Sequence, residues 1–223
     1  MSPARRIKTF TDKYPFVGPA FWIVTVQYIV AQIAAAGAWD VHYSLRHNVI
    51  SDLGNTGCGN FAGRFVCSPL HDLMNVSFVV LGITMLVGAG LIYQEFKETE
   101  GSALGFGFMG LAGIGTLIVG LFPENSIPAL HGLGAFLPFF IGNIGMVLLG
   151  WVLNVPWWLK VYSVVSGLIA LVGFGLFTTH HYLGVGVGGM ERLTAYPQTA
   201  WLIVFGLYIS SSHIQKIMAT RSS

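Results

Sequence analysis

The chain has 223 residues, of which 54% are hydrophobic and 9% are charged, and its formal net charge is +2. Soluble domains carry about 25% charged residues, so this composition excludes a soluble protein, and the high apolar content excludes a disordered chain. The small net charge gives no indication of a nucleic-acid partner. We therefore predict one all-α domain over residues 1–223 that spans the plasma membrane several times, in contact with membrane lipids.

Apolar segments predict six transmembrane helices. A bilayer core of ~30 Å requires about 20 helical residues per crossing. The segments that qualify run over residues 16–38, 71–93, 102–121, 131–153, 161–178 and 197–211. The N-terminus resembles a signal peptide, because it is basic, then apolar, then rich in small residues. Its apolar stretch is long for a signal peptide, so we expect the first helix to be retained.

The basic residues predict the orientation in the membrane. Eight of the eleven Lys and Arg fall before the first span, after the sixth span, or in the two short connections on the same side. The other side holds only Arg46, Arg64 and Arg192. Because basic residues collect on the cytoplasmic side, both termini are predicted to be cytoplasmic. The long connection 39–70 is then extracytoplasmic, as are six of the seven histidines.

Two cysteines, Cys58 and Cys67, lie in this outer connection. A pair of cysteines in an oxidising compartment predicts a disulfide. Such a bond closes a loop of about ten residues and stabilises the fold by roughly 2.5–3 kcal/mol. The alternatives are two free thiols or a metal-binding pair, although a metal pair usually has closer, CxxC-like spacing.

The second and fourth spans begin in a similar way. Each start has a proline followed by a histidine, His71 or His131, with a glycine eleven residues later. The pair Glu191–Arg192 comes another sixty residues along the chain. This spacing indicates three helical hairpins related as repeats. Even without a repeat, the predicted topology places His71 and His131 at a similar depth in the membrane.

Polar residues at the outer helix ends are the candidates for a site. Asp52, in the sequence SDLG, is either a cap or turn residue or a general base or metal ligand. Asp72 beside His71 either compensates the helix dipole or fixes the imidazole tautomer, as partners of metal ligands do. His131 at a helix start is expected to be neutral and hydrogen-bonded, or a ligand. Glu124 is expected to be a solvated loop charge.

The last outer connection adds two adjacent pairs. His180 and His181 point about 100° apart if they are helical, so only one of them is expected to face the bundle. Their alternative role is in an aromatic belt. Glu191 and Arg192 follow the glycine-rich sequence GVGGM, and this segment is predicted to be a flexible loop. They either orient one another, or Arg192 binds an anionic headgroup, or they form a surface ion pair of little energetic value.

These residues together predict a polar site on one outer rim. Three imidazoles with a carboxylate suit zinc, with an open coordination position for water. The predicted metal ligands are His71, His131 and either His180 or His181. The predicted catalytic residues are Asp52, as base or fourth ligand, and Glu191 with Arg192, which position the substrate. No HExxH, CxxC or GxSxG pattern occurs, so the hypothesis depends on this convergence.

Several short motifs extend over nearly the whole chain. They are SDLG at 51–54, His71, GLFP at 120–123 followed by His131, Glu191–Arg192, and Trp201 in the last helix. On these motifs the chain resembles the family called domain of unknown function 998, which implies six helices and no assigned reaction. It is more loosely similar to alkaline ceramidases and adiponectin receptors, which have seven helices and a zinc site of histidines with Ser and Asp. Their closing His-x-x-x-His pattern and seventh helix are absent here, which counts against carrying zinc and hydrolysis over.

The sequence leads to two functional hypotheses, one for an enzyme and one for a non-catalytic protein. The first is a metal-dependent hydrolase or transferase that acts on a lipid or envelope substrate, as the one-sided polar cluster indicates. The second is a non-catalytic subunit that binds a lipid or other membrane-protein subunits in a larger complex. It is indicated by helix interiors without ionisable residues and by glycines that permit close helix packing. These glycines are Gly82, Gly105, Gly107, Gly110, Gly113, Gly173 and Gly175.

Overall fold

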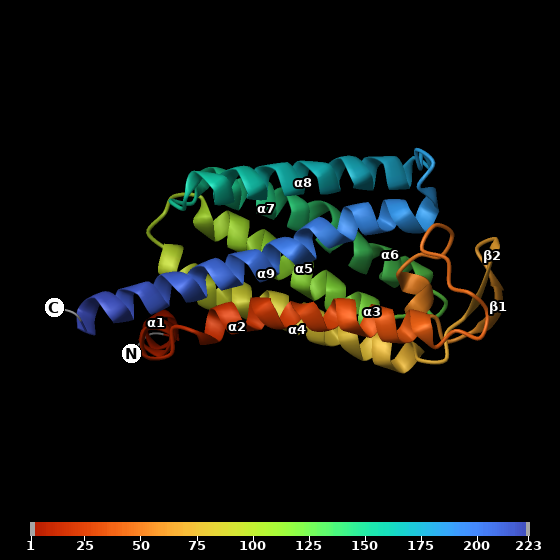
Figure 1. The fold of residues 1–223 in the computed structure, drawn as a ribbon, viewed down its shortest axis with the longest axis horizontal. Helices are drawn as coiled ribbons and strands as arrows, with labels where there is room; N and C mark the ends of the chain where they lie inside the picture. The colour runs from red at the N-terminus through yellow and green to blue at the C-terminus, as the bar shows by residue number, and fades with distance from the viewer. Residues whose placement is uncertain (1–2, 222–223) are drawn as a thin grey trace.

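A computed structural model describes the backbone of residues 3–221 and the side chains of residues 7–220. Long apolar helices form a bundle with a small two-stranded sheet at one end (Figure 1). The helices are α1 (Pro3–Lys13), α2 (Val17–Ile23), α3 (Gln27–Gly37), α4 (His71–Phe96), α5 (Ser102–Leu121), α6 (Pro128–Phe136), α7 (Asn143–Val152), α8 (Trp157–Thr178) and α9 (Gly186–Arg221). The orientation in the membrane was predicted partly from Arg5, Arg6 and Arg221, whose side chains lie outside the described residues.

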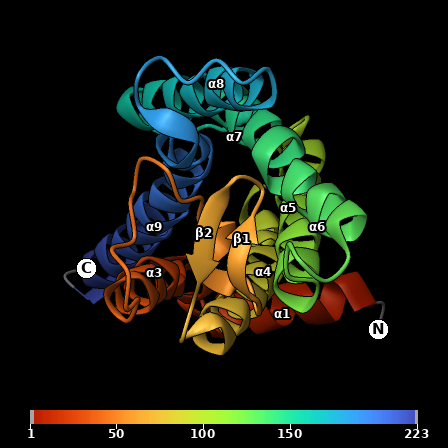
Figure 2. The same cartoon turned by 90° about the vertical axis from the view of Figure 1, so that its right-hand side faces the viewer.

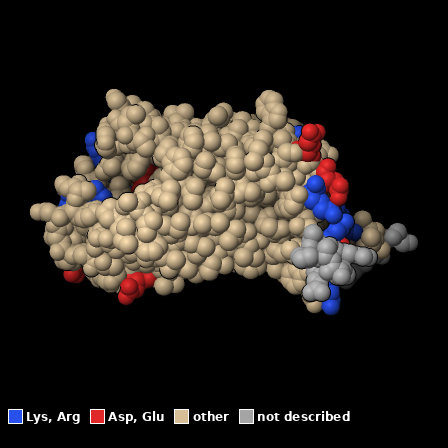
Figure 3. Space-filling view, turned by 180° about the vertical axis from the view of Figure 1, so that it is seen from behind, with Lys and Arg blue, Asp and Glu red and all other residues tan. Residues whose placement is uncertain are grey.

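Within the described residues, six helical segments are long and apolar enough to cross a membrane. They are Val17–Gly37, His71–Phe96, Ser102–Leu121, Pro128–Val152, Trp157–Thr178 and Gly186–Thr220. The first joins α2 to α3 through a 3-10 turn, η1 (Val24–Val26), and the fourth joins α6 to α7 through a π-helical turn, η3 (Leu137–Gly142). The charged side chains visible in Figure 3 lie mainly toward the two ends of the molecule, with a wide uncharged band between them. These features are consistent with a six-span membrane protein.

The two termini lie at the same end of the bundle (Figure 1). The sheet and the long connection 39–70 lie at the opposite end, which we call the outer end. The cytoplasmic location of the termini and the three hairpin repeats both stay predictions.

The last helix differs from the one expected. It begins at Gly186 rather than at residue 197, so the segment expected as a loop is helical and Pro197 lies inside the helix. Its first turn packs tightly on the chain near Arg46, whose carbonyl accepts a hydrogen bond from the Gly188 N–H at 3.0 Å. A Cβ at Gly188 would lie 2.6 Å from the Leu45 carbonyl oxygen, so only glycine permits this approach. The residues expected in the loop are therefore held on a packed helix.

Close packing of α4 against α5 depends on glycine. A Cβ at Gly113 would lie 2.7 Å from the carbonyl oxygen of Gly82, and a Cβ at Gly82 would lie 2.6 Å from that of Gly113. By contrast, a Cβ at Gly107 or Gly175 would have nothing within 4 Å. Some of the glycines that suggested assembly with other subunits are therefore used to pack helices within the chain.

The connection 39–70 folds into a cap over the outer end of the bundle (Figure 2). It contains a 3-10 turn, η2 (Ser51–Gly54), and the antiparallel strands β1 (Cys58–Phe61) and β2 (Arg64–Cys67). Cys58 and Cys67 are paired across the strands and form a disulfide, with their Cα atoms 4.2 Å apart. The predicted disulfide is confirmed, and it braces the hairpin that carries Arg64.

Candidate functional site

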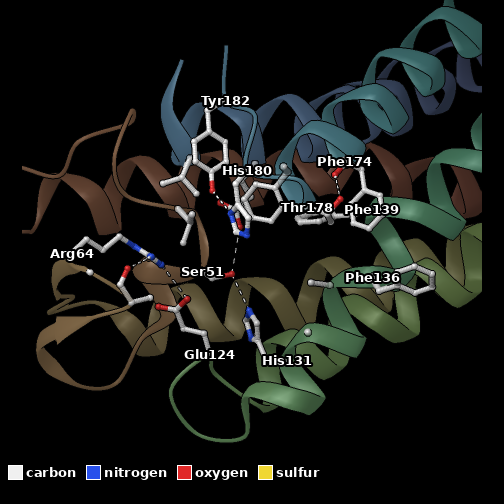
Figure 4. Close-up of a pocket in the computed structure, with 18 of the residues that line it drawn as sticks. Ser51, Arg64, Glu124, His131, Phe136, Phe139, Phe174, Thr178, His180 and Tyr182 are labelled. Atoms are coloured by element: carbon white, nitrogen blue, oxygen red, sulfur yellow. Dashed lines mark hydrogen bonds and ion pairs between the residues drawn. The ribbon is translucent and has the colours of Figure 1, made fainter. Parts of the chain in front are cut away.

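A cavity of about 940 Å³ opens at the outer end of the bundle, where the cap meets α6, α8 and α9. Figure 4 shows its polar and apolar parts side by side, with Arg64 and Glu124 toward one end and Phe136, Phe139 and Phe174 toward the other. The residues around its polar part are His47, Ser51, Arg64, Glu124, His131, His180, Tyr182 and Glu191. The apolar part is formed by Ala135, Phe136, Phe139, Phe174 and Phe177. The cavity therefore has the character of an amphiphile-binding site.

Ser51 and His131 form a hydrogen-bonded pair in this cavity. Ser51 is the first residue of η2, and His131 lies in the first turns of α6. The imidazole Nε2 is 2.9 Å from the Ser51 Oγ, and Nδ1 is 2.9 Å from the Phe122 carbonyl oxygen. Because a carbonyl oxygen only accepts, Nδ1 carries the proton in this arrangement and Nε2 is the acceptor. The Ser51 hydroxyl therefore donates to His131, as a nucleophile does to its general base.

Glu191 supports the pair from α9. Its side chain is buried, and one of its oxygens accepts a hydrogen bond from the Ile50 N–H at the start of η2. Its other oxygen is 3.5 Å from the Ser51 Oγ. A carboxylate from the last helix thereby fixes the turn that presents the serine, although the two residues are 140 positions apart.

Asp52 and Glu124 share one arginine beside the pair. Arg64 forms short bonds to Asp52, with Nη2 2.6 Å from Oδ1 and Nε 2.7 Å from Oδ2, and its Nη2 is 3.6 Å from Glu124. The amide of Asn48 also donates to Asp52, at 3.0 Å. The amide of Asn55 donates to Glu124 at 2.8 Å. Burial, with the neighbouring charge of Asp52, raises the pKa of Glu124 to about 8.

This geometry alters the interpretation of two acidic residues. Glu124 was expected to be a solvated loop charge, but it is 9% exposed and lines the cavity; that expectation was wrong because the cap folds over it. Asp52 is completely buried, both of its oxygens accept hydrogen bonds, and it is not among the residues that line the cavity. Its contacts are those of a residue that positions Arg64 and η2.

The predicted metal ligands are only partly brought together. His131 and His180 both line the cavity, and the Nδ1 of His180 bonds to the Tyr182 hydroxyl at 2.8 Å. His71 instead bonds to the Ser68 carbonyl oxygen at 2.8 Å, and His181 is exposed. Among the described residues, no three His, Cys, Asp or Glu side chains are grouped so that they could hold a metal ion. The donor set therefore does not fit the predicted three-imidazole zinc centre.

Arg192 points away from Glu191, its neighbour on α9. Its guanidinium bonds to the Tyr43 hydroxyl and to carbonyl oxygens of the cap and of α9, including Asn48 at 2.9 Å and Gly188 at 2.8 Å. Glu191 lines the main cavity, whereas Arg192 lines a separate groove between α3 and α9. Among the described residues no ion pair joins Glu191 to Arg192, although the two side chains were expected to orient one another.

Sequence reasoning missed the serine and the arginine of this site. Ser51 entered the sequence analysis only as part of the motif SDLG, whose Asp52 was interpreted as a cap or turn residue or as a base or ligand. Arg64 stood out only as one of three basic residues on the outer side. Two features of the sequence could have pointed to Ser51. It belongs to the motif SDLG, which carried the family resemblance, and the imidazole of His131 needed a hydrogen-bond partner.

Comparison with known proteins gives one finding. A family model described as "Protein of unknown function (DUF998)" matches residues 22–208. No curated protein and no solved structure matches the chain. The match covers all residues of the site described above.

Proposed function

The chain belongs to the DUF998 family, and we propose that it is a hydrolase or transferase acting on a lipid-like ester at the extracytoplasmic face of the plasma membrane. The observation that carries this proposal is the hydrogen bond between Ser51 and His131, at 2.9 Å, inside a cavity with one polar and one apolar part. A serine activated by a neighbouring histidine is a recurring arrangement in acyl transfer.

The proposed reaction has two steps. His131 Nε2 takes the proton of the Ser51 hydroxyl while Oγ attacks the carbonyl carbon of the ester. The ester C–O bond then breaks, and the alcohol leaves with the proton from His131, which gives an acyl-serine. Water completes a hydrolysis, or the hydroxyl of a second lipid completes a transfer, with His131 again acting as the base. We assign this base to His131 rather than to Asp52, because the Asp52 oxygens are already occupied.

The remaining residues supply orientation and substrate selection. The Phe122 carbonyl holds the imidazole in the required tautomer, and Glu191 fixes η2 through the Ile50 N–H. Arg64 lies at the polar part of the cavity, but Asp52 balances its charge, so this part suits a polar headgroup. The phenylalanines of α6, η3 and α8 provide the surface for an acyl chain.

The metal-dependent version of this proposal has its own test. The predicted zinc site of His71, His131 and either His180 or His181 with a carboxylate stays a prediction, although the described residues hold no such group of ligands. Metal analysis of the purified chain would support it by finding one zinc per chain that is lost in His180→Ala. An absence of stoichiometric zinc in a preparation with lipid-ester activity would remove it.

A non-catalytic role is the competing proposal, because Ser51 and Glu191 are also part of the contacts that hold the cap on α9. In that case the chain binds a lipid or other membrane subunits and makes no covalent intermediate. The apolar wall of the cavity supports lipid binding under either proposal, so the test must address the chemistry of the serine.

A fluorophosphonate probe in detergent, together with fluorogenic lipid esters in vesicles, provides that test. The wild-type chain should be labelled at Ser51 and should hydrolyse or transfer at least one ester class. Ser51→Ala should abolish both, and His131→Gln should lower turnover by roughly 10²–10⁴-fold. Ser126→Ala is the matched control, because Ser126 is an exposed outer serine bonded to the Pro123 carbonyl. Equal labelling and turnover in wild type and Ser51→Ala would refute the serine mechanism.

A further inference from the structure

A second hollow lies on the other side of α9, away from Ser51. This groove, of about 460 Å³, runs between α3 and the outer part of α9 and reaches the cap. Its polar members include Gln32, Trp39, Tyr43 and Arg192. None of these four lines the cavity of the Ser51–His131 pair.

Three N–H groups around this groove have no hydrogen-bond partner within the described part of the chain. They are Nε2 of Gln32, Nε1 of Trp39 and Nε of Arg192. Gln32 is 4% exposed and Arg192 is 8% exposed. A buried donor without an acceptor costs about 1–3 kcal/mol, so three such donors on one groove are unusual in a folded protein. Each of the three N–H groups lacks an acceptor oxygen.

The charge on Arg192 points to the nature of that acceptor. The guanidinium contacts only neutral oxygens, namely the Tyr43 hydroxyl and the carbonyls of Leu45, Asn48 and Gly188. No carboxylate among the described residues forms an ion pair with it. A buried cation is normally paired with an anion, and these neutral contacts do not provide one. The missing group is therefore expected to be both an acceptor and an anion.

Apart from His42 and Tyr196, the rest of the groove is apolar, and it faces the lipid side of the bundle. Ile29, Ile33 and Ala36 line it from α3, and Leu53 lines it from the cap. Ile33 is 70% exposed on the bundle surface, where a membrane helix meets acyl chains. The donors lie near the outer end of α3, at the level expected for headgroups. A free anion would leave this apolar strip uncovered, whereas a lipid covers it.

We propose that the groove between α3 and α9 binds an anionic phospholipid, whose phosphate accepts hydrogen bonds from Gln32, Trp39 and Arg192 and whose acyl chain lies along α3. The three nitrogens are shielded from solvent, so binding includes small rotations of the Gln32 amide, the Trp39 ring and the Arg192 side chain. The Oε1 of Gln32 is 2.9 Å from the Tyr196 hydroxyl, which leaves Nε2 free to donate. This site is independent of the chemistry proposed for Ser51.

The test uses the full chain in detergent and native mass spectrometry with three probes. These are phosphatidylglycerol, phosphatidylcholine with the same acyl chains, and inorganic phosphate. One phosphatidylglycerol should bind per chain at least tenfold more tightly than phosphatidylcholine, because only the former is a net anion. Trp39→Phe removes a single donor that has no partner in the fold, so it should weaken phosphatidylglycerol binding roughly tenfold and leave the fold intact.

Two further variants make the outcome clear. Gln32→Leu should weaken binding to a similar degree. Trp151→Phe is the matched control, because Trp151 is 78% exposed and does not line the groove; it should bind as wild type does. The proposal is overturned if the two lipids bind equally, or if Trp39→Phe and Gln32→Leu bind phosphatidylglycerol as tightly as Trp151→Phe. It is also overturned if inorganic phosphate binds as tightly as the lipid, since the ligand is then the free ion.

Discussion

Glu124 should make the stability of the cap depend on pH. Its side chain is about 10% exposed, and burial together with Asp52 raises its pKa from 4.5 to about 8. A carboxyl group whose pKa is raised on folding holds its proton more tightly in the folded state. Its contribution to stability is therefore complete below the unfolded pKa and is lost as the pH rises through about 8.

The size of this effect follows from the two pKa values. Between pH 6 and pH 9 the free energy of unfolding should fall by about 2–3 kcal/mol through this group alone. For a chain of this length that corresponds to a fall of about 5–10 °C in Tm. Glu124→Gln keeps an acceptor oxygen for the Asn55 amide but does not ionise, so it should lose most of this pH dependence.

Thermal unfolding in detergent, followed by a thiol-independent dye at pH 6, 7, 8 and 9, measures the difference. Asp72→Asn is the control, because the Asp72 side chain is 93% exposed and its removal should leave the wild-type pH dependence in place. If wild type and Glu124→Gln lose stability in parallel across this range, the reasoning about Glu124 is refuted.

Four further predictions concern the cap and the helix packing. Arg64→Met leaves the Asp52 carboxylate buried without its cation, so unfolding should show a loss of about 3–5 kcal/mol; a wild-type Tm would contradict this. Reduction of the hairpin disulfide should lower stability by about 2.5–3 kcal/mol, measured as the Tm with and without reductant. Gly113→Leu should prevent recovery of folded protein in size-exclusion chromatography. Gly107→Ala should be neutral or stabilising by up to about 1 kcal/mol, since its Cβ meets nothing within 4 Å.

The membrane class, six long apolar helices and the disulfide could all be predicted from the sequence. Hydropathy is a local property, and a span needs only a long enough apolar segment. The two cysteines were the only possible pair. The start of α9 could not be predicted in this way, because a glycine-rich segment before Pro197 is typical of a loop. Packing of Gly188 against the cap overrides that local preference.

The candidate site was predicted only in part, for a similar reason. Its residues come from segments far apart in the sequence, with Ser51 80 positions from His131 and 140 from Glu191. The sequence indicated that the histidine and the glutamate lie at the outer end, but it gave no means of pairing them with a serine. The burial of Glu124 depends on the cap that covers it, which no local pattern around Glu124 describes.

Because Glu191 and Arg192 are consecutive on α9 and face different hollows, one rigid rod forms a wall of both. Any rotation or shift of this rod that improves contacts on one side changes the spacing on the other. If a ligand in one hollow shifts this helix, it also changes the other hollow, and the effect of each ligand on the affinity of the other must then be reciprocal. The effects of a substitution at Glu191 or Arg192 should therefore be measured without ligand and with each hollow filled in turn.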